Sequence, residues 1–455
     1  MASVSVEKRS DPSMIAVRVL PLNYLVVLLL ASFVSAFVLY VEADVLAYFL
    51  LGVAWIVIPI LALQDRVIFD GRRISRSGVI PRIWSRATST RDRIKLNDVE
   101  HVQTATLRTI KRGGNLIYTY RTTFFGKGKA FTIHSGSRSY RAFLEAVFPK
   151  LNESSLDVRS LDLRDHLDDR IAVRRRAMEA SIPPPDILEG SLRNPLPKLP
   201  DSKTCDTPER AEALHRLANE LRVSGLIPQA IEAFRRAVLL MPRNARLLLD
   251  FALCLRSYAA VYRDHSAARK ALALIRLAER RAGDDGQLLT DIGEGYFQFG
   301  EWRRAGVTFR KAIERAGNRF RSLVGLAELA LQEGKIAHVI LNFSAARELA
   351  ETPAARRWAT HEIDYFSKLN DDEEYMELEI SRMNLLDTLT VVRRSALRIA
   401  MVGFPIIVGG IIAEEGLIAN LGWAVSLISF GVWSIVLVMS HMLAARLPYD
   451  LVEDK

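Results

Sequence analysis

The sequence contains very little cysteine, since Cys205 and Cys254 are the only two among 455 residues. Two cysteines cannot form the disulfide framework of a small secreted protein, and neither has a partner at metal-ligand spacing. Cys254 lies in an apolar helical pattern and is expected to be a small core residue. This cysteine usage is typical of a protein from a reducing compartment.

The sequence also lacks the short motifs of common enzymes. It contains no phosphate loop of the type G-x-x-x-x-G-K-[ST], no G-x-S-x-G motif and no H-E-x-x-H motif. The glycines and lysines from Gly126 to Lys129 predict a hairpin turn, because no strand-to-helix transition follows them. The eight histidines are scattered and none lies at metal-ligand spacing. We therefore expect no catalytic residue, no metal site and no cofactor; an enzyme with an unrecognised site is the third alternative to the two functions described below.

Apolar runs lie at both ends of the chain. Val19 to Val41 and Val45 to Gln64 carry no charged side chain, and each is close to the roughly 20 residues that cross a bilayer core. Leu421 to Leu443 is a third run of this kind. Ile399 to Ala413 is a shorter fourth, interrupted by one proline and a pair of glycines. We expect a transmembrane helical hairpin at each end, with residues 399–413 forming either a short span or a re-entrant segment.

Basic residues flank both hairpins on one side. They are Lys8, Arg9 and Arg18 before the first hairpin, Arg66, Arg72, Arg73 and Arg76 after it, Arg393, Arg394 and Arg398 before the second, and Arg446 after it. The positive-inside rule therefore predicts that both termini and all soluble parts lie on the cytoplasmic side of the inner (plasma) membrane. A signal peptide cleaved near Ala36 is the alternative, but the apolar run continues past that point. Glu414 and Glu415, in the second turn, are interpreted as an interfacial loop rather than a proton path.

A basic segment follows the first hairpin. Residues 66–150 contain 18 Lys and Arg against 5 Asp and Glu, a balance of +13, while the whole chain has +10. Apolar residues alternate with period two between turn signals, and an amphipathic helix is expected from Ser139 to Leu151. This pattern of strands closed by one helix resembles the bacterial pleckstrin-homology-like domains of membrane proteins. The resemblance implies a small, mostly β domain over residues 66–151.

Nine basic residues are expected on the loops and edges of this domain: Arg72, Arg73, Arg76, Arg82, Arg86, Lys111, Arg112, Lys127 and Lys129. One interpretation is that they face anionic lipid, where each basic side chain contributes about 1 kcal/mol. The other is that they are solvated residues that only enforce the topology. The same charge attracts nucleic acid, but no specific nucleic-acid site is indicated.

Residues 152–206 separate this domain from the second half of the chain. Residues 160–180, which include three consecutive arginines from Arg174 to Arg176, are expected to form an exposed charged helix. Prolines recur from Pro183 to Pro200, which predicts a stiff, extended linker and a domain boundary.

A period of 34 residues follows the linker. The first repeat begins at Ala211, the third at Gly286 and the fourth at Phe320, and small and large apolar residues recur at matching positions. In the first repeat these are Leu214, Leu217, Ala218, Leu221, Ala230, Phe234 and Ala237, with Pro242 at the close. The stretch closely resembles the tetratricopeptide (TPR) repeat family, which implies an all-α solenoid over residues 207–395. In the second repeat an insertion of about two helical turns, near residues 258–267, delays the second helix, and after the fourth an acidic helix from Asp371 is expected to run into the third membrane segment.

The first helix of each repeat lines the concave groove of such a solenoid. The repeat positions predict that a protein partner binds to His215, Asn219, Arg222, Arg246, Arg256, Gln287, Glu294, Arg321 and Glu328. In chaperone-binding members of the family, basic residues and asparagines clamp the C-terminal carboxylate of a peptide. Here Asn219 matches, but Asp250 and Asp291 stand where that clamp needs a donor. A carboxylate clamp is therefore not expected.

Together these patterns predict a multi-domain membrane protein. Its expected parts are a transmembrane hairpin (1–65), a basic β-rich domain (66–151), a charged helix and proline-rich linker (152–206), TPR repeats with a capping helix (207–395) and a second transmembrane hairpin with a short tail (396–455). The first functional hypothesis is a membrane-anchored, non-enzymatic scaffold that recruits a protein partner through a cytoplasmic TPR groove. The alternative is a membrane-surface sensor that binds anionic lipid through the basic domain, with the repeats serving oligomerisation.

Overall fold

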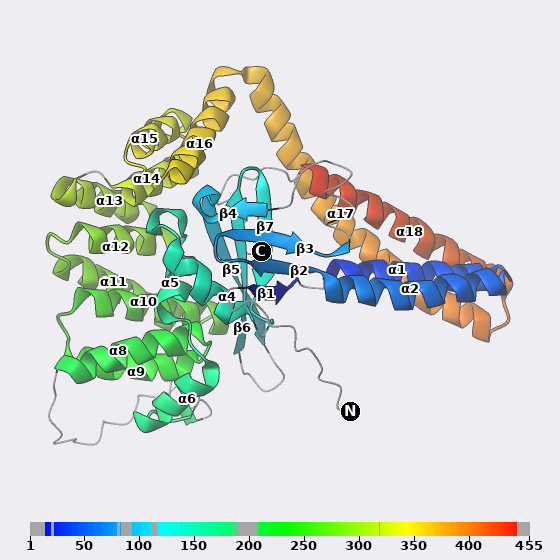
Figure 1. Cartoon of the computed structure of the whole chain (residues 1–455), viewed down its shortest axis with the longest axis horizontal. Helices are drawn as coiled ribbons and strands as arrows, with labels where there is room; N and C mark the ends of the chain where they lie inside the picture. Colours follow the sequence, from blue (N-terminus) through cyan, green and yellow to red (C-terminus); the bar gives the residue numbers. More distant parts are fainter. Residues whose placement is uncertain are drawn as a thin grey trace, which may run out of the picture. The chain divides into compact units, whose positions relative to one another are not determined.

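The computed structural model describes residues 14–19, 22–79, 82, 93–110, 116–137, 139–184, 187–188, 208–317 and 319–443. The chain divides into two compact units (Figure 1). The first consists of Met1–Leu20 and Gln64–Ile363, and the second of Pro21–Leu63 and Asp364–Lys455. The proline-rich linker does not separate the two units, and most of it lies outside the described residues.

Two small antiparallel sheets begin the first unit. One contains β1 (Ile15–Arg18), β2 (Arg66–Phe69), β3 (Arg73–Ser77) and β4 (Arg93–Lys95) in that order, and the other contains β5 (His101–Ile110), β6 (Leu116–Gly126) and β7 (Lys129–His134). The strand β1 was not predicted from the sequence; it precedes the apolar hairpin and pairs with β2, which directly follows the hairpin. Four residues are too short a run for the alternating pattern to stand out. The sheet therefore draws a strand from each side of the hairpin.

A single helix, α4 (Tyr140–Val147), packs against both sheets. Its Phe143 ring lies 5.9 Å from that of Phe69 in the first sheet and 5.9 Å from that of Phe124 in the second. Phe143 and both of its partners are almost fully buried, so one aromatic cluster joins the two sheets. The expected β strands and closing helix are present. The resemblance to pleckstrin-homology-like domains stays a prediction.

Two short helices follow, α5 (Val158–His166) and α6 (Arg170–Glu179). The Asp157 carboxylate caps α5 by accepting the backbone N–H of Ser160 at 2.8 Å. The expectation of one exposed charged helix over residues 160–180 was wrong, because Leu163 on α5 and Val173 on α6 are buried. Both helices contact α8 of the solenoid, and that tertiary contact is not visible in the local charge pattern.

Four antiparallel helix pairs form the solenoid and stack in chain order (Figure 1). They are α8 (Pro208–Val223) with α9 (Ile227–Leu240), α10 (Ala245–Tyr262) with α11 (His265–Arg281), α12 (Gly286–Gln298) with α13 (Trp302–Ala316), and α14 (Phe320–Gln332) with α15 (Ile336–Glu348). Small residues let the helices approach closely: a Cβ at Gly293 or at Gly325 would lie under 3 Å from the buried ring of Phe309. The expected TPR-like helical repeats are therefore present as helix pairs.

The second pair differs from the others at its turn. Gly225, Gly300 and Gly334 turn the other three pairs with positive φ, whereas Arg263 takes this conformation in the second pair, at φ 51°. The inserted residues extend α10 and α11 to 18 and 17 residues, compared with 13 to 16 in the other pairs. The insertion therefore lengthens both helices and forms no separate loop.

The second unit contains the apolar helices. They are α1 (Leu22–Tyr40), α2 (Asp44–Gln64), α17 (Glu373–Ile412) and α18 (Gly416–Leu443); α16 (Pro353–Asp371) begins in the first unit and ends in the second. Within the described chain, α2, α17 and α18 are long and apolar enough to cross a membrane, whereas the apolar part of α1 is shorter, Tyr24–Tyr40. Bulky apolar side chains lie on the surface of this unit; Trp55 is 59% exposed and Phe404 61%.

The helices α17 and α18 pack through small residues. A Cβ at Gly403 would lie 2.1 Å from the hydroxyl of Ser426, and one at Gly410 would lie 2.4 Å from the backbone nitrogen of Ala419. The α17 helix continues through Pro405 to Ile412, so residues 399–413 are the end of a 40-residue helix and do not form a separate short element. The turn that follows exposes Glu414 and Glu415.

Candidate functional site

The residues predicted to line the groove lie on the first helices of the repeats, and many of them bind one another. On α8, His215 Nε2 lies 2.7 Å from a carboxylate oxygen of Asp250 on α10, and Asn219 donates to the same oxygen at 3.1 Å. Arg246 forms ion pairs with Asp250 and with Asp291 of α12. Burial alone would raise the pKa of Asp250, but the hydrogen bond from His215 and the nearby positive charges outweigh it and hold that pKa well below its usual range.

A second charge cluster lies further along the solenoid. Arg321 on α14 contacts Glu294 at 2.6 Å and Asp291 at 3.2 Å, both on α12. Burial raises the pKa of Glu294 to about 7, against the lowering effect of Arg321. Gln287 is exposed at the start of α12, and Glu328 is half-buried on α14. Arg256 on α10 donates to Gln298 on α12 at 2.6 Å.

The two acidic residues that argued against a carboxylate clamp therefore have a structural role. Asp291 neutralises Arg246 and Arg321 from the repeats on either side of its own. Asp250 pairs with Arg246 on its own helix and joins α10 to α8 through its hydrogen bonds with His215 and Asn219. Because Asp250 is buried, removing it would leave the side chains of His215 and Asn219 without their hydrogen-bond partner, which is costly inside a protein. The groove chemistry is thus largely satisfied within the array.

The groove also holds the chain's own β-rich segment. Arg222 on α8 donates two hydrogen bonds to the carboxylate of Asp162 on α5, at 2.8 and 2.9 Å. The hydroxyl of Tyr120 on β6 donates to the carbonyl of Val223 at 2.5 Å, and Val223 belongs to the same apolar cluster as the sheets. In the fourth repeat, Arg321 on α14 lies 3.7 Å from the carboxylate of Glu153, just before α5.

The far end of the solenoid contacts the same segment. Arg357 on α16 lies 3.3 Å from the carboxylate of Glu100 and 3.7 Å from that of Asp98. The Trp358 ring stacks on His101 of β5, with ring centroids 5.9 Å apart and planes 22° apart. Burial lowers the pKa of His101 to about 3, so this imidazole is neutral at physiological pH. Helices from α8 to α16 therefore contact the chain's own β domain.

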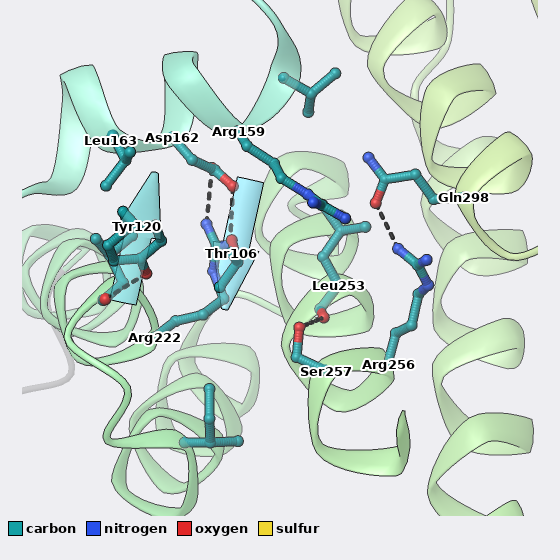
Figure 2. A pocket seen from close by; sticks show the side chains of 13 residues that line it. Thr106, Tyr120, Arg159, Asp162, Leu163, Arg222, Leu253, Arg256, Ser257 and Gln298 are labelled. Carbon is teal, nitrogen blue, oxygen red and sulfur yellow. Dashed lines mark hydrogen bonds and ion pairs between the residues drawn. The ribbon is translucent and has the colours of Figure 1, made fainter. Parts of the chain in front are cut away.

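A small cavity of about 90 Å³ lies between α5, the sheet that contains β5 and β6, and the solenoid helices α8, α10 and α12 (Figure 2). Arg159 from α5, Arg222 from α8 and Arg256 from α10 line it, together with Asp162. Figure 2 shows Asp162 paired with Arg222 and Gln298 with Arg256. The cavity is lined mostly by basic and polar groups. No group of three His, Cys, Asp or Glu side chains that could hold a metal ion occurs among the described residues.

The residues of the predicted basic patch are not all available for a ligand. Arg76 donates to both oxygens of the buried carboxylate of Asp65, at 2.9 and 2.6 Å, and Lys127 lies 2.8 Å from Asp98. Arg72, Arg73 and Arg82 are exposed and Lys129 is half-buried, while Arg86, Lys111 and Arg112 lie outside the described residues. Among the six of these residues that the structure describes, Arg76 and Lys127 are therefore already in ion pairs with carboxylates of the same domain.

Sequence reasoning missed the residues that fill the groove. Asp162 belongs to the stretch 160–180 that was interpreted as an exposed helix, and Glu153 was assigned no role. Asp98 and Glu100 lie in a domain described by its positive charge. One signal was present: the few acidic residues of a strongly basic segment are candidates for partners of distant arginines. The periodicity that located the repeats carries no information about such long-range pairs.

No family model and no curated protein matches the chain. Among solved structures, it is similar to a TPR protein of Thermus thermophilus (22% identity, 39% of this chain and 88% of that chain, TM-score 0.29). It is also similar to the MamA protein (14%, 37% and 97%, TM-score 0.26) and to the Cut9–Hcn1 hetero-tetramer of the APC/C (15%, 68% and 53%, TM-score 0.29). At these scores the likeness carries no argument, and the repeat architecture rests on the four helix pairs themselves.

Proposed function

We propose that this protein is a membrane-anchored, non-enzymatic scaffold that recruits a protein partner through the groove of its helical repeats. The proposal is supported by the joining of a helical-repeat array to a unit whose long apolar helices expose bulky side chains. Helical repeats of this kind present extended concave binding surfaces. In this proposal both termini and the first unit face the cytoplasm.

The observation that carries the proposal is that acidic side chains of the chain's own segments face arginines of the solenoid. Arg222 faces a carboxylate from α5, Arg321 faces one from the segment just before α5, and Arg357 faces one from the β-rich segment. Arginine recognises carboxylates through a planar fork of donors, which gives direction as well as attraction. A partner that presents acidic side chains is therefore the kind that this groove fits, and it would compete with Asp162 and Glu153.

Partner capture from mild detergent extracts tests this proposal. The full chain carries a photo-reactive amino acid at Gln287, which is exposed in the groove, and crosslinked proteins are identified by mass spectrometry. Weakening the internal contacts with Asp162→Ala and Glu153→Ala is expected to increase capture. Charge reversal with Arg222→Glu and Arg256→Glu is expected to abolish it while circular dichroism stays helical.

A matched control reverses charge away from the groove, with Arg303→Glu and Arg310→Glu on the exposed side of α13. These changes should leave capture unaltered. If the groove reversal leaves capture intact in a folded protein, or if the control abolishes it, a different surface binds the partner. Resistance of the wild-type protein to extraction by alkaline carbonate tests the membrane anchor separately.

A further inference from the structure

The first sheet has two faces of opposite character. Residues in register on neighbouring antiparallel strands share a face, and side chains alternate along each strand. One face contains the buried Val17, Val67 and Ile74 and packs toward the aromatic cluster. The opposite face, called here the outer sheet face, carries the exposed side chains of Arg18, Arg66, Arg73, Arg93 and Lys95.

Like charges lie directly opposite one another on the outer sheet face. Arg18 on β1 pairs in register with Arg66 on β2, and Arg73 on β3 pairs in register with Lys95 on β4. Directly opposed like charges destabilise an antiparallel pair. None of the five basic side chains of this face forms an ion pair with the part of the chain that the structure describes. Within the described residues, the face is therefore a concentration of positive charge that no carboxylate pairs with.

The other basic residues of the domain show the contrast. Arg76 lies on the buried face of the same sheet, and its guanidinium binds the carboxylate of Asp65, which is 1% exposed. Lys127 is paired with Asp98. Among the described residues, carboxylates of the domain thus pair with Arg76 and Lys127 but not with the basic side chains of the outer sheet face. An external anion would relieve the repulsion there.

The position of the Arg18–Arg66 pair in the chain identifies the anion. Arg18 lies four residues before α1 begins at Leu22, and Arg66 lies two residues after α2 ends at Gln64. If α1 and α2 enter the bilayer, as the proposed function requires, both arginines lie within a few residues of its surface. Cα atoms of directly opposed residues are about 5 Å apart, so two guanidinium groups can hold one phosphate.

We propose that the outer sheet face, formed by Arg18, Arg66, Arg73, Arg93 and Lys95, binds the phosphate headgroups of anionic phospholipids in the membrane that holds the chain. This inference rests on the proposed membrane anchor. It differs from the predicted basic patch, because two members of that patch are already in ion pairs and two of the residues closest to the hairpin were not in it. Anionic headgroups attract basic side chains near the surface, and salt screens this attraction.

The test places a fluorophore on the outer sheet face of the full chain. Ser75, which is half-buried on β3, is changed to cysteine and labelled in a Cys205→Ser background. Burial raises the pKa of Cys254 to about 12, so that thiol stays unlabelled. The protein is placed in nanodiscs of phosphatidylcholine with or without phosphatidylglycerol, and nitroxide-headgroup lipid reports proximity by quenching.

Quenching is expected in discs that contain phosphatidylglycerol and should fall as salt rises. Each basic side chain near the headgroups raises the ratio of docked to undocked protein about fivefold. The variant with Arg18→Gln, Arg66→Gln, Arg73→Gln and Lys95→Gln should therefore have a ratio that is several hundred-fold lower, on the order of 5 to the fourth power. The matched control replaces three arginines and one lysine on α11 (Arg269, Lys270, Arg280 and Arg281) with glutamine and should keep the quenching. The variant with Arg18→Lys and Arg66→Lys, which retains the charge without the fork, should lie between these results.

Several results would overturn the inference. Equal quenching in neutral and anionic discs, or quenching that survives the four glutamine substitutions in a folded protein, contradicts headgroup binding. Loss of the quenching when inorganic phosphate is added at the same concentration as lipid phosphate would indicate a site for free anions. Equal loss of the quenching when duplex DNA is added would indicate a nonspecific basic surface. Failure of the chain to enter nanodiscs overturns the membrane anchor and this inference together, whereas entry without docking overturns this inference alone.

Discussion

Arg222 and Asp162 are 60 positions apart in the sequence, and their side chains form a bidentate ion pair with hydrogen bonds of 2.8 and 2.9 Å. The guanidinium comes from the first helix of the solenoid and the carboxylate from the helix that follows the β domain. Arg222 also donates to Asn219 on its own helix. The pair therefore joins the groove network to the segment that fills the groove.

Removing the carboxylate should destabilise the first unit. Asp162→Ala leaves the 12%-exposed Arg222 side chain without its charged acceptor, which costs about 2 kcal/mol. Chemical unfolding of the full chain in detergent, followed by tryptophan fluorescence, measures the loss. In the double variant Asp162→Ala with Arg222→Ala part of the stability should return, since no buried charge is left alone. Additive losses from the two single variants would show that the pair is not coupled.

The stability of the first unit should fall as pH rises through about 6. Burial raises the pKa of Asp157 to about 6, although its hydrogen bonds from Ser160 and Thr104 and the charge of Arg159 lower it. A carboxyl group whose pKa is raised on folding contributes stability that is complete below its unfolded pKa, near 4, and is lost as pH rises through the folded pKa. The difference corresponds to about 3 kcal/mol.

The unfolding midpoint of Asp157→Asn, measured from pH 4 to pH 8, tests this linkage. The variant should show a smaller fall with pH than the wild type, because its side chain does not titrate. Glu294, whose pKa burial raises to about 7, contributes a fall in the same direction, so the comparison with the wild type isolates Asp157. An unchanged pH profile would contradict the assignment.

Two adjacent glycines in α17 should respond differently to a methyl group. A Cβ at Gly410 meets the backbone of Ala419 at 2.4 Å, whereas one at Gly409 meets nothing within 4 Å. Gly410→Ala should therefore separate α17 from α18 and cost about 1–3 kcal/mol, while Gly409→Ala should cost nothing. Thermal unfolding in detergent compares the two variants. Equal effects of both would show that the two helices do not pack through this contact.

The left-handed residue of the second repeat offers a stabilising change. Arg263 has φ 51°, a conformation that costs a residue with a side chain about 1 kcal/mol and costs glycine nothing comparable. Arg263→Gly should therefore raise the free energy of unfolding by about that amount. Gly300→Ala, at φ 74° in the third repeat, should lower it by a similar amount. Loss of stability in Arg263→Gly would mean that the arginine side chain makes a contact worth more than the strain.

The local elements could largely be predicted from the sequence. The spacing of Ala230, Phe234 and Ala237 located α9, because apolar residues on the packed face of a helix recur every three to four residues. Alternation of apolar residues predicted β strands in the segment that contains β5, β6 and β7, for the same local reason. The strand β1 was missed, since four residues beside an apolar run give no clear alternation.

The residues predicted to line the groove lie on the first helix of each repeat, but their contacts were not predictable. Periodicity places Arg222, Arg246 and Arg321 on one side of the array without indicating what faces them. Asp162 contacts Arg222 and Glu153 contacts Arg321, because α5 and the segment just before it lie against the solenoid. These contacts join segments that are far apart in the chain. The prediction that a partner binds there stays a prediction.

The amino-acid sequence by itself determined the helices, most strands, the repeat period and the apolar segments, because each depends on residues within a few positions of one another. The tertiary structure decided which charges are neutralised and which are left exposed. It paired Arg222 with Asp162 and Arg76 with Asp65, and among the described residues it set Arg18 opposite Arg66 with neither in an ion pair. The physical reason is that a charge is compensated by whatever lies within a few ångströms in space, and only the folded chain determines those distances.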